Sequence, residues 1–121
     1  MFRVRAAHDE AFRQDALRRF VERVLAHLRQ DLAKQTAGCA DDALRARVGS
    51  CIERAKTYGL LTQREVVCFV DATYLLGEDF DTAAETEWAA EILRSDASAA
   101  DRALSLVATS GRISEARRER E

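Results

Sequence analysis

Residues 62–77, TQREVVCFVDATYLLG, contain the most hydrophobic segment of the chain. Its Val-Val-Cys-Phe-Val run is compatible with a buried strand as well as with a helix. Thr62 and Glu65, however, form a capping box, in which hydroxyl and carboxylate each accept a hydrogen bond from a free backbone N–H. Gly77 then supplies a residue suited to a helix end. These start and stop signals predict a central helix over about 63–76.

A second helix is expected upstream, from Asp41 or Asp42 to about Tyr58. Its apolar residues recur three or four apart, as one face of a helix requires, and they are Leu44, Val48, Ile52 and Ala55. Gly59 follows, at the C′ position, where glycine enters the left-handed region without a Cβ penalty. The segment therefore predicts an amphipathic helix that ends at a glycine.

A long first helix is expected from about Asp9, its N-cap, to about Gln35, after a short irregular lead-in over residues 1–8. Its apolar stripe recurs at every fourth position and comprises Phe12, Ala16, Phe20, Val24, Leu28 and Leu32, widened by Leu17, Val21 and Leu25. Such a helix spans roughly 40 Å. That is longer than a chain of this size needs, so we expect one end to protrude or to pack on a partner.

Two shorter helices are expected downstream of a polar loop at residues 77–82. The first covers about 83–95, with Trp88, Ile92 and Leu93 facing inward. The second starts at Ser98 and ends at about Ser110, with Leu104 and Val107 as its stripe. Beyond Gly111, residues 112–121 form a charged C-terminal tail that we expect to fray.

Composition agrees with a helical chain. The 121 residues include 22 alanines, no proline and only 5 glycines, and 47% of them are hydrophobic. This is helix-forming material with few breakers, and a chain of this length suits one core rather than two. We therefore predict an all-α fold: a single compact domain of about five helices over 1–111, with a long N-terminal helix and a tail at 112–121.

Charge is balanced overall and uneven along the chain. Nineteen Lys and Arg against 21 Asp and Glu are too balanced for generic nucleic-acid binding, which needs a basic face. Residues 1–30 hold seven arginines and four acids, whereas residues 78–101 hold eight acids and one arginine, Arg94. No stretch resembles a secretory signal or a membrane span. We expect a cytoplasmic protein that binds neither nucleic acid nor membrane.

Residues with catalytic or metal-binding potential are few. Cys39, Cys51 and Cys68 are odd in number and widely spaced, which favours reduced thiols over a disulfide framework or a zinc site. The histidines, His8 and His27, both lie in the N-terminal part, and no nucleophile–base motif accompanies them. We therefore expect no enzyme activity, no cofactor and no metal.

Aromatic residues beside loops are open to two interpretations. Tyr58, Tyr74 and Trp88 each carry a polar atom that needs a partner. They either seal the rim of a helical core or anchor a protein–protein interface, where aromatic residues are enriched.

An ordered series over residues 55–93 resembles a known group of proteins. It comprises AKTYGL (55–60), TQRE (62–65), FV (69–70), GEDFD (77–81) and WAAEIL (88–93). The series is similar to small helical proteins encoded in bacterial type VI secretion clusters, beside effectors and their loading adaptors. Some members of that group act as co-adaptors, which bind the adaptor or effector before delivery. The resemblance implies a protein-binding role and brings no catalytic residues.

The functional hypothesis is a non-enzymatic cytoplasmic accessory protein that binds a secretion effector or its adaptor or chaperone through a helical surface. We expect that surface on the acidic region after the central helix, with Phe80 and Trp88 as apolar anchors. The candidate residues are Asp79, Phe80, Asp81, Glu85, Glu87, Trp88 and Glu91. The alternative is an immunity protein that neutralises a toxin by covering its active site with acidic residues.

Overall fold

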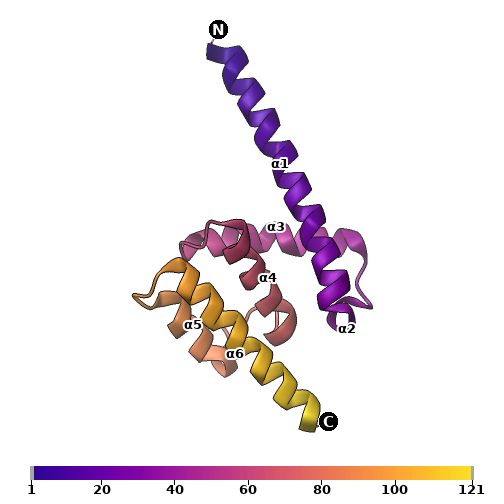
Figure 1. Cartoon of the computed structure of the whole chain (residues 1–121), viewed down its shortest axis with the longest axis vertical. Coiled ribbons are helices and arrows are strands. Elements are labelled where there is room, and N and C mark those ends of the chain that lie inside the picture. Colours follow the sequence, from indigo (N-terminus) through magenta and orange to yellow (C-terminus); the bar gives the residue numbers. More distant parts are fainter. Residues whose placement is uncertain (1, 121) are drawn as a thin grey trace.

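The computed structural model describes the backbone of residues 2–120 and the side chains of residues 13–117. Over this range the chain is helical and contains no strand, which confirms the all-α prediction. The elements in chain order are α1 (Phe2–Asp31), α2 (Ala33–Thr36), α3 (Asp41–Thr57), α4 (Gln63–Leu76), the 3-10 turn η1 (Ala84–Thr86), α5 (Glu87–Arg94) and α6 (Ala99–Arg120). Figure 1 shows the N-terminal part of α1 and the C-terminal end of α6 pointing to opposite ends of the molecule.

Helix α4 lies at the centre of the packing, as its sequence predicts. It contacts α1, α3 and α6, and its Phe69, Val70 and Ala72 are fully buried. The core around it draws on most helices and includes Val24, Leu28, Leu44, Val48, Cys51, Ala55, Leu60, Phe80, Leu93 and Leu106. A helix surrounded in this way needs apolar residues on more than one face, which explains the dense hydrophobic run.

The ends of α4 follow the local signals. The Thr62 hydroxyl accepts from the Glu65 N–H at 3.2 Å, and the Glu65 carboxylate accepts from the Thr62 N–H at 3.3 Å, so the capping box is present. Gly77 ends the helix with φ +130°, and Gly59 follows α3 with φ +77°. Both glycines have the positive φ that residues with a Cβ rarely adopt.

The first helix differs from its prediction at both ends and along its stripe. Its described part begins at Phe2, so the irregular lead-in expected over residues 1–8 is wrong for residues 2–8, and Asp9 lies inside the helix rather than at its cap. The helix ends at Asp31 rather than at about Gln35. Phe20, Val24, Leu25 and Leu28 are buried, but Ala16 is exposed and Leu17 is 48% exposed. The Phe12 side chain lies outside the described ones.

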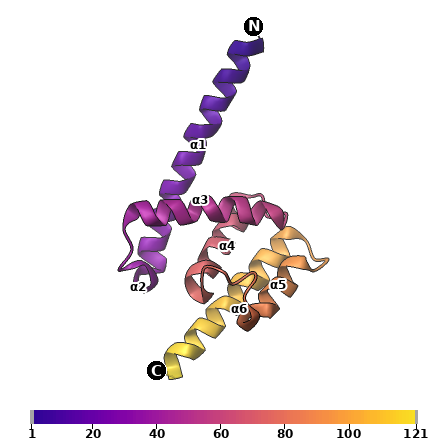
Figure 2. The same ribbon diagram turned by 180° about the vertical axis from the view of Figure 1, so that it is seen from behind.

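Two physical reasons account for the exposed part of α1. A row of residues four apart drifts by about 40° per step around a helix, so Ala16 lies about 120° from Leu28. The packing partners of α1 are α2, α3 and α4, and they lie against its C-terminal half, as Figure 2 shows from behind. The N-terminal half therefore extends beyond the body, which agrees with the expectation that one end protrudes.

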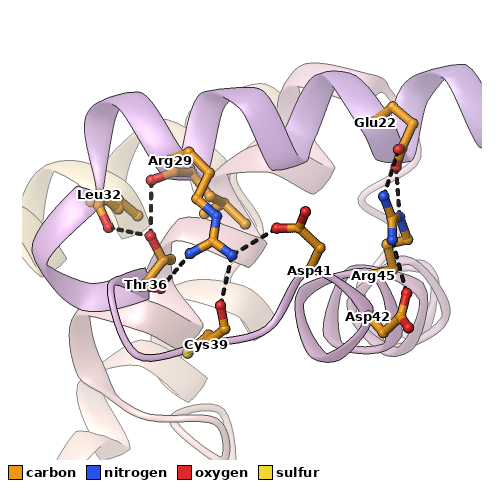
Figure 3. Close-up of polar contacts among 9 residues, drawn as sticks. Glu22, Arg29, Leu32, Thr36, Cys39, Asp41, Asp42 and Arg45 are labelled. Carbon is orange, nitrogen blue, oxygen red and sulfur yellow. Dashed lines mark hydrogen bonds and ion pairs between the residues drawn. The ribbon is translucent and has the colours of Figure 1, made fainter.

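Two arginines fix α1 against α3 (Figure 3). The Arg29 guanidinium donates to the Thr36 carbonyl at 2.5 Å, the Cys39 carbonyl at 2.6 Å and Asp41 at 2.7 Å. It thereby closes the turn that follows the break at Leu32, where α2 separates from α1. The guanidinium of Arg45, on α3, donates through two nitrogens to Glu22 at 2.9 and 3.0 Å and through the third to Asp42.

Helix α6 continues past its predicted end at Ser110 and reaches Arg120, so the segment expected to fray begins inside the helix. A glycine costs a helix about 1 kcal/mol relative to alanine but does not stop it, and Gly111 does not have a positive φ. The predicted stripe of Leu104 and Val107 is wrong for Leu104, which is 54% exposed, whereas Val107 is half-buried. The buried row consists of Ala103, Leu106 and Ser110.

Candidate protein-interaction surface

The proposed interaction residues fall into a buried pair and an exposed set. Phe80 is 1% exposed and its ring lies 5.0 Å from that of Phe69, centroid to centroid. Its backbone N–H donates to the Gly77 carbonyl at 3.2 Å, and its backbone carbonyl accepts from the Thr86 hydroxyl at 2.6 Å. The prediction of Phe80 as an interface anchor is therefore wrong, because the loop turns this ring into the core beside α4.

Asp81 is 5% exposed and is the centre of a polar cluster within the fold. One carboxylate oxygen accepts from the Arg54 guanidinium and the other from the Tyr58 hydroxyl, the latter at 2.8 Å. Arg54 also donates to the Glu78 carbonyl at 2.8 Å. Burial and the hydrogen bond to Asp81 raise the pKa of Tyr58. Asp81 thus joins the 77–82 loop to α3 and is not available to a partner.

The two tyrosines support the rim interpretation. Tyr58 is half-buried and bonded to Asp81, as described above. Tyr74 is half-buried beneath the Arg47 guanidinium, which lies 4.3 Å from the ring centroid. Burial raises the pKa of the Tyr74 hydroxyl. Both residues therefore close the edge of the core.

The exposed set lies on and before α5. Asp79, Glu85, Glu87 and Glu91 are exposed, and Trp88 is half-buried against the core. Trp88 therefore keeps part of its indole accessible beside two acidic residues. Of the predicted surface, these five side chains stay available for contact.

A groove between α5 and α6 brings part of this set together with residues that lie far along the chain. Its volume is about 430 Å³. It is lined by Trp88, Glu91, Ile92 and Ser95 from α5 and its C-cap, by Ala97 from the following loop, and by Arg102, Ser105, Thr109 and Ile113 from α6. Apolar side chains (Trp88, Ile92 and Ile113), charged ones (Glu91 and Arg102) and hydroxyl groups give this groove a mixed character.

Arg102 holds the two walls of the groove together. Its guanidinium donates to the carbonyls of Leu93 at 2.6 Å and Ala97 at 3.1 Å, which end α5 and begin the next turn. It also donates to the Tyr58 carbonyl at 2.7 Å, at the end of α3. Since three backbone carbonyls accept from one side chain, the groove has a preformed shape.

The sequence pattern did not indicate the α6 wall, because the expected helix ended at Ser110, before Ile113, and its predicted stripe was Leu104 and Val107. Ser105, Thr109 and Ile113 are spaced four apart and share one helix face. That spacing passes through Gly111 without interruption, and it places Ile113 on the same helix face as Ser105 and Thr109. Its pairing with Trp88 depends on how α5 folds back on α6, which no local pattern specifies.

Among the described side chains with catalytic potential, His27 is paired, Cys51 and Cys68 are buried, and Cys39 is half-buried. The ring nitrogens of His27 contact Asp31 at 2.9 Å and Asp71 at 2.8 Å, so neither faces a free substrate position. The cysteines are free thiols. Burial raises the pKa of Cys51 and of Cys68, which keeps both protonated near neutral pH. Among the described side chains, no set of three His, Cys, Asp or Glu residues is arranged to hold a metal ion.

Comparison with protein-family models, characterised proteins and solved structures finds no match to this chain. In the part of the chain that the structure describes, no helix combines the length and the apolar character that crossing a bilayer requires. The candidate site of this chain is the groove between α5 and α6 together with the exposed acidic residues beside it.

Proposed function

We propose that this chain is a non-enzymatic accessory protein that binds another protein in the groove between α5 and α6 and along its acidic edge. The observation that carries the proposal is the half-buried Trp88, which lines a preformed groove together with Ile92, Ile113 and Glu91. Tryptophan, tyrosine and arginine are enriched among the residues that dominate binding energy at protein interfaces.

The dimensions of the groove suit a helical or extended segment of a partner. From Arg102 to Ile113 the α6 wall is about 16 Å long, roughly three helical turns. A partner helix placing apolar residues at three- and four-residue spacing covers such a length. The Ser105 and Thr109 hydroxyls supply polar contacts along the wall.

The acidic edge favours a basic partner. Glu87 and Glu91 are exposed and one turn apart on α5, an arrangement that costs the helix a few tenths of a kcal/mol. The field of such a pair accelerates association with positively charged surfaces. We infer that the partner presents Lys or Arg beside its apolar contact residues.

The non-enzymatic character is supported by the state of the reactive groups. Both nitrogens of His27 face carboxylates, so the ring is not placed as a free base. Cys51 and Cys68 are buried and their pKa is raised. Nucleophilic catalysis needs the opposite, an accessible and activated thiol with a base in reach.

The resemblance of residues 55–93 leads us to propose a type VI secretion effector, or its adaptor or chaperone, as the partner, bound in the bacterial cytoplasm. In this chain several of the matching residues support the fold. Tyr58 binds Asp81, Gly59 ends α3, and Thr62 with Glu65 caps α4. We therefore propose that the shared series maintains the scaffold and that Trp88 and Glu91 make the contact.

An immunity protein is the second candidate, and the four exposed acids Asp79, Glu85, Glu87 and Glu91 favour it. In that role the chain would cover a basic active site of a toxin. Co-expression separates the two functions, because an immunity protein protects cells from the toxin by itself. An accessory protein leaves toxicity unchanged and affects delivery.

The test is to measure whether this chain binds proteins encoded by neighbouring genes, and how fast each complex associates. Wild type should bind one of them, and the Glu87→Lys/Glu91→Lys variant should associate more slowly and with less dependence on salt. Asp42→Lys/Glu53→Lys, at exposed positions on α3 outside the groove, makes the same change in net charge and should bind like wild type. Equal association rates for all three proteins would rule out the acidic edge as the contact surface.

A further inference from the structure

The N-terminal half of α1 has no buried face where its side chains are described. Residues 13–19 are all exposed, although they make up nearly two helical turns. Leu17, at 48% exposure, is one of three large apolar side chains that the described part of the chain leaves in solvent. Because an amphipathic helix normally buries its apolar side against a neighbour, the face at Leu17 is open in the single chain.

Two arginines flank Leu17 on this segment. On the surface of the helix, Arg13 lies about 40° to one side of Leu17 and Arg18 about 100° to the other. Neither arginine forms an ion pair with a described side chain. The whole of residues 1–30 holds seven arginines against four acids. The segment is therefore a basic amphipathic helix whose exposed leucine lies between two cations.

The groove between α5 and α6 presents the complementary pattern. Its half-buried Trp88 follows Glu87 directly and precedes Glu91 by three residues, and both acids are exposed. Residues 78–101 hold eight acids against one arginine. The α6 wall of the groove is about 16 Å long, and residues 13–19 span about 10 Å along the helix axis. The exposed segment of α1 thus matches the groove in length, in charge and in its single large apolar residue.

The groove of the same chain is out of reach of this segment. Helix α1 is continuous from Phe2 to Asp31, and it packs on α2, α3 and α4 through its C-terminal half. Figures 1 and 2 show its N-terminal half pointing away from α5 and α6. A contact between the segment and the groove therefore needs a second copy of the chain.

We propose that the groove between α5 and α6 binds the N-terminal half of α1 from a second copy of this chain, with Leu17 against Trp88 and the two arginines beside the acidic edge. This inference rests on the proposed function, because it requires the groove to be a protein-binding surface, and it concerns the regulation of that surface. A contact of about two helical turns is smaller than the interface of a stable complex. The self-association is therefore weak, and another protein that enters the groove displaces the second copy.

The experiment measures self-association of the full chain by sedimentation velocity over a range of concentrations. Wild type should associate, and less so at high salt, because salt screens exposed charges. Arg13→Glu/Arg18→Glu and Glu87→Lys/Glu91→Lys should each weaken association about tenfold, since each turns attraction into repulsion at two positions. An equal mixture of the two variants should associate again, because each α1 segment then meets a groove of opposite charge.

The control for charge is Lys34→Glu/Lys56→Glu, at exposed positions on α2 and α3. It makes the same change in net charge as the α1 variant and should associate like wild type. A monomeric wild type, or a mixture that associates no better than its two components, would overturn the proposal. The proposed function fails on a different result, namely that no protein encoded by a neighbouring gene binds to wild type.

A second pair of variants tests the contact without a change of charge. Leu17→Ala should weaken self-association about three- to tenfold, because about half of this leucine is newly buried in the contact. Leu61→Ala is the matched control, at a leucine that is 70% exposed and lies outside the groove lining, and it should associate like wild type. Equal association of the two variants would refute the contact.

Discussion

Removal of the Asp81 carboxylate is the sharpest test of the folded structure. In the Asp81→Ala variant, Arg54 loses its ion pair and the Tyr58 hydroxyl loses its acceptor. The 77–82 loop then loses the two hydrogen bonds by which Asp81 joins it to Arg54 and Tyr58. The sequence placed Asp81 on a binding surface, where its loss would leave stability unchanged, so the two interpretations predict different results.

The expected loss in the free energy of unfolding follows from the groups that Asp81→Ala leaves without a partner. Removing one partner of a fully buried ion pair costs about 3–5 kcal/mol, and an unsatisfied buried hydroxyl costs about 1–3 kcal/mol. The Arg54 side chain is 26% exposed and keeps its bond to the Glu78 carbonyl, so water restores part of its solvation. We expect Asp81→Ala to lower the free energy of unfolding by about 2–3 kcal/mol.

Urea unfolding followed by circular dichroism measures this change. Asp79→Ala, two residues away at an exposed position, is the matched control and should stay within about 0.5 kcal/mol of wild type. A double-mutant cycle with Tyr58→Phe should show a coupling of about 0.5–1 kcal/mol, because the two side chains share a bond. A loss below about 1 kcal/mol in Asp81→Ala, or additive effects in the cycle, would refute the buried cluster.

Four further predictions test separate elements. Gly111→Ala should raise the unfolding free energy by up to about 1 kcal/mol, since α6 passes through Gly111 with open space at its Cβ position; a loss of stability would mean that the helix ends there. Gly59→Val should cost about 1–2 kcal/mol because φ is +77°, and an unchanged melting temperature would contradict that conformation. Thr62→Ala should cost about 1 kcal/mol through loss of the cap, measured by urea unfolding against Thr57→Ala at the end of α3. The raised pKa of Tyr58 favours its neutral form in the folded state, so the free energy of unfolding should fall as pH rises above about 10. Because Asp81 adds to the effect of burial at Tyr58, Tyr58→Phe should make that fall shallower than Tyr74→Phe does, and equal slopes for the two variants would contradict a contribution from Asp81.

Several features of this protein were predicted from the sequence because they depend on local energies. The capping box at Thr62 and Glu65, the glycines after α3 and α4, and the limits of α4 involve residues within one turn of each other. Their hydrogen bonds and backbone preferences are nearly the same in any context. For the same reason the all-α class followed from composition and periodicity.

The candidate site was predicted less well, since accessibility is a property of the packing. Phe80 and Asp81 stand in a polar loop between Glu78 and Thr82, and the sequence around them is typical of a solvated segment. The loop instead turns toward α3 and α4, where Phe69 provides an aromatic contact and Arg54 an opposite charge. These partners lie 11 and 27 positions away in the sequence, beyond the reach of a local pattern.

Local signals in the amino-acid sequence specify the helical class, the central position of α4 and the helix ends that carry capping residues or positive-φ glycines. The packing of the helices, in contrast, sets how far α1 extends beyond the body, buries Phe80 and Asp81, and places Trp88 and Ile113 along one groove. The physical reason is the range of the interactions. Capping and periodicity act within a turn, whereas burial depends on which surfaces meet after the chain has folded.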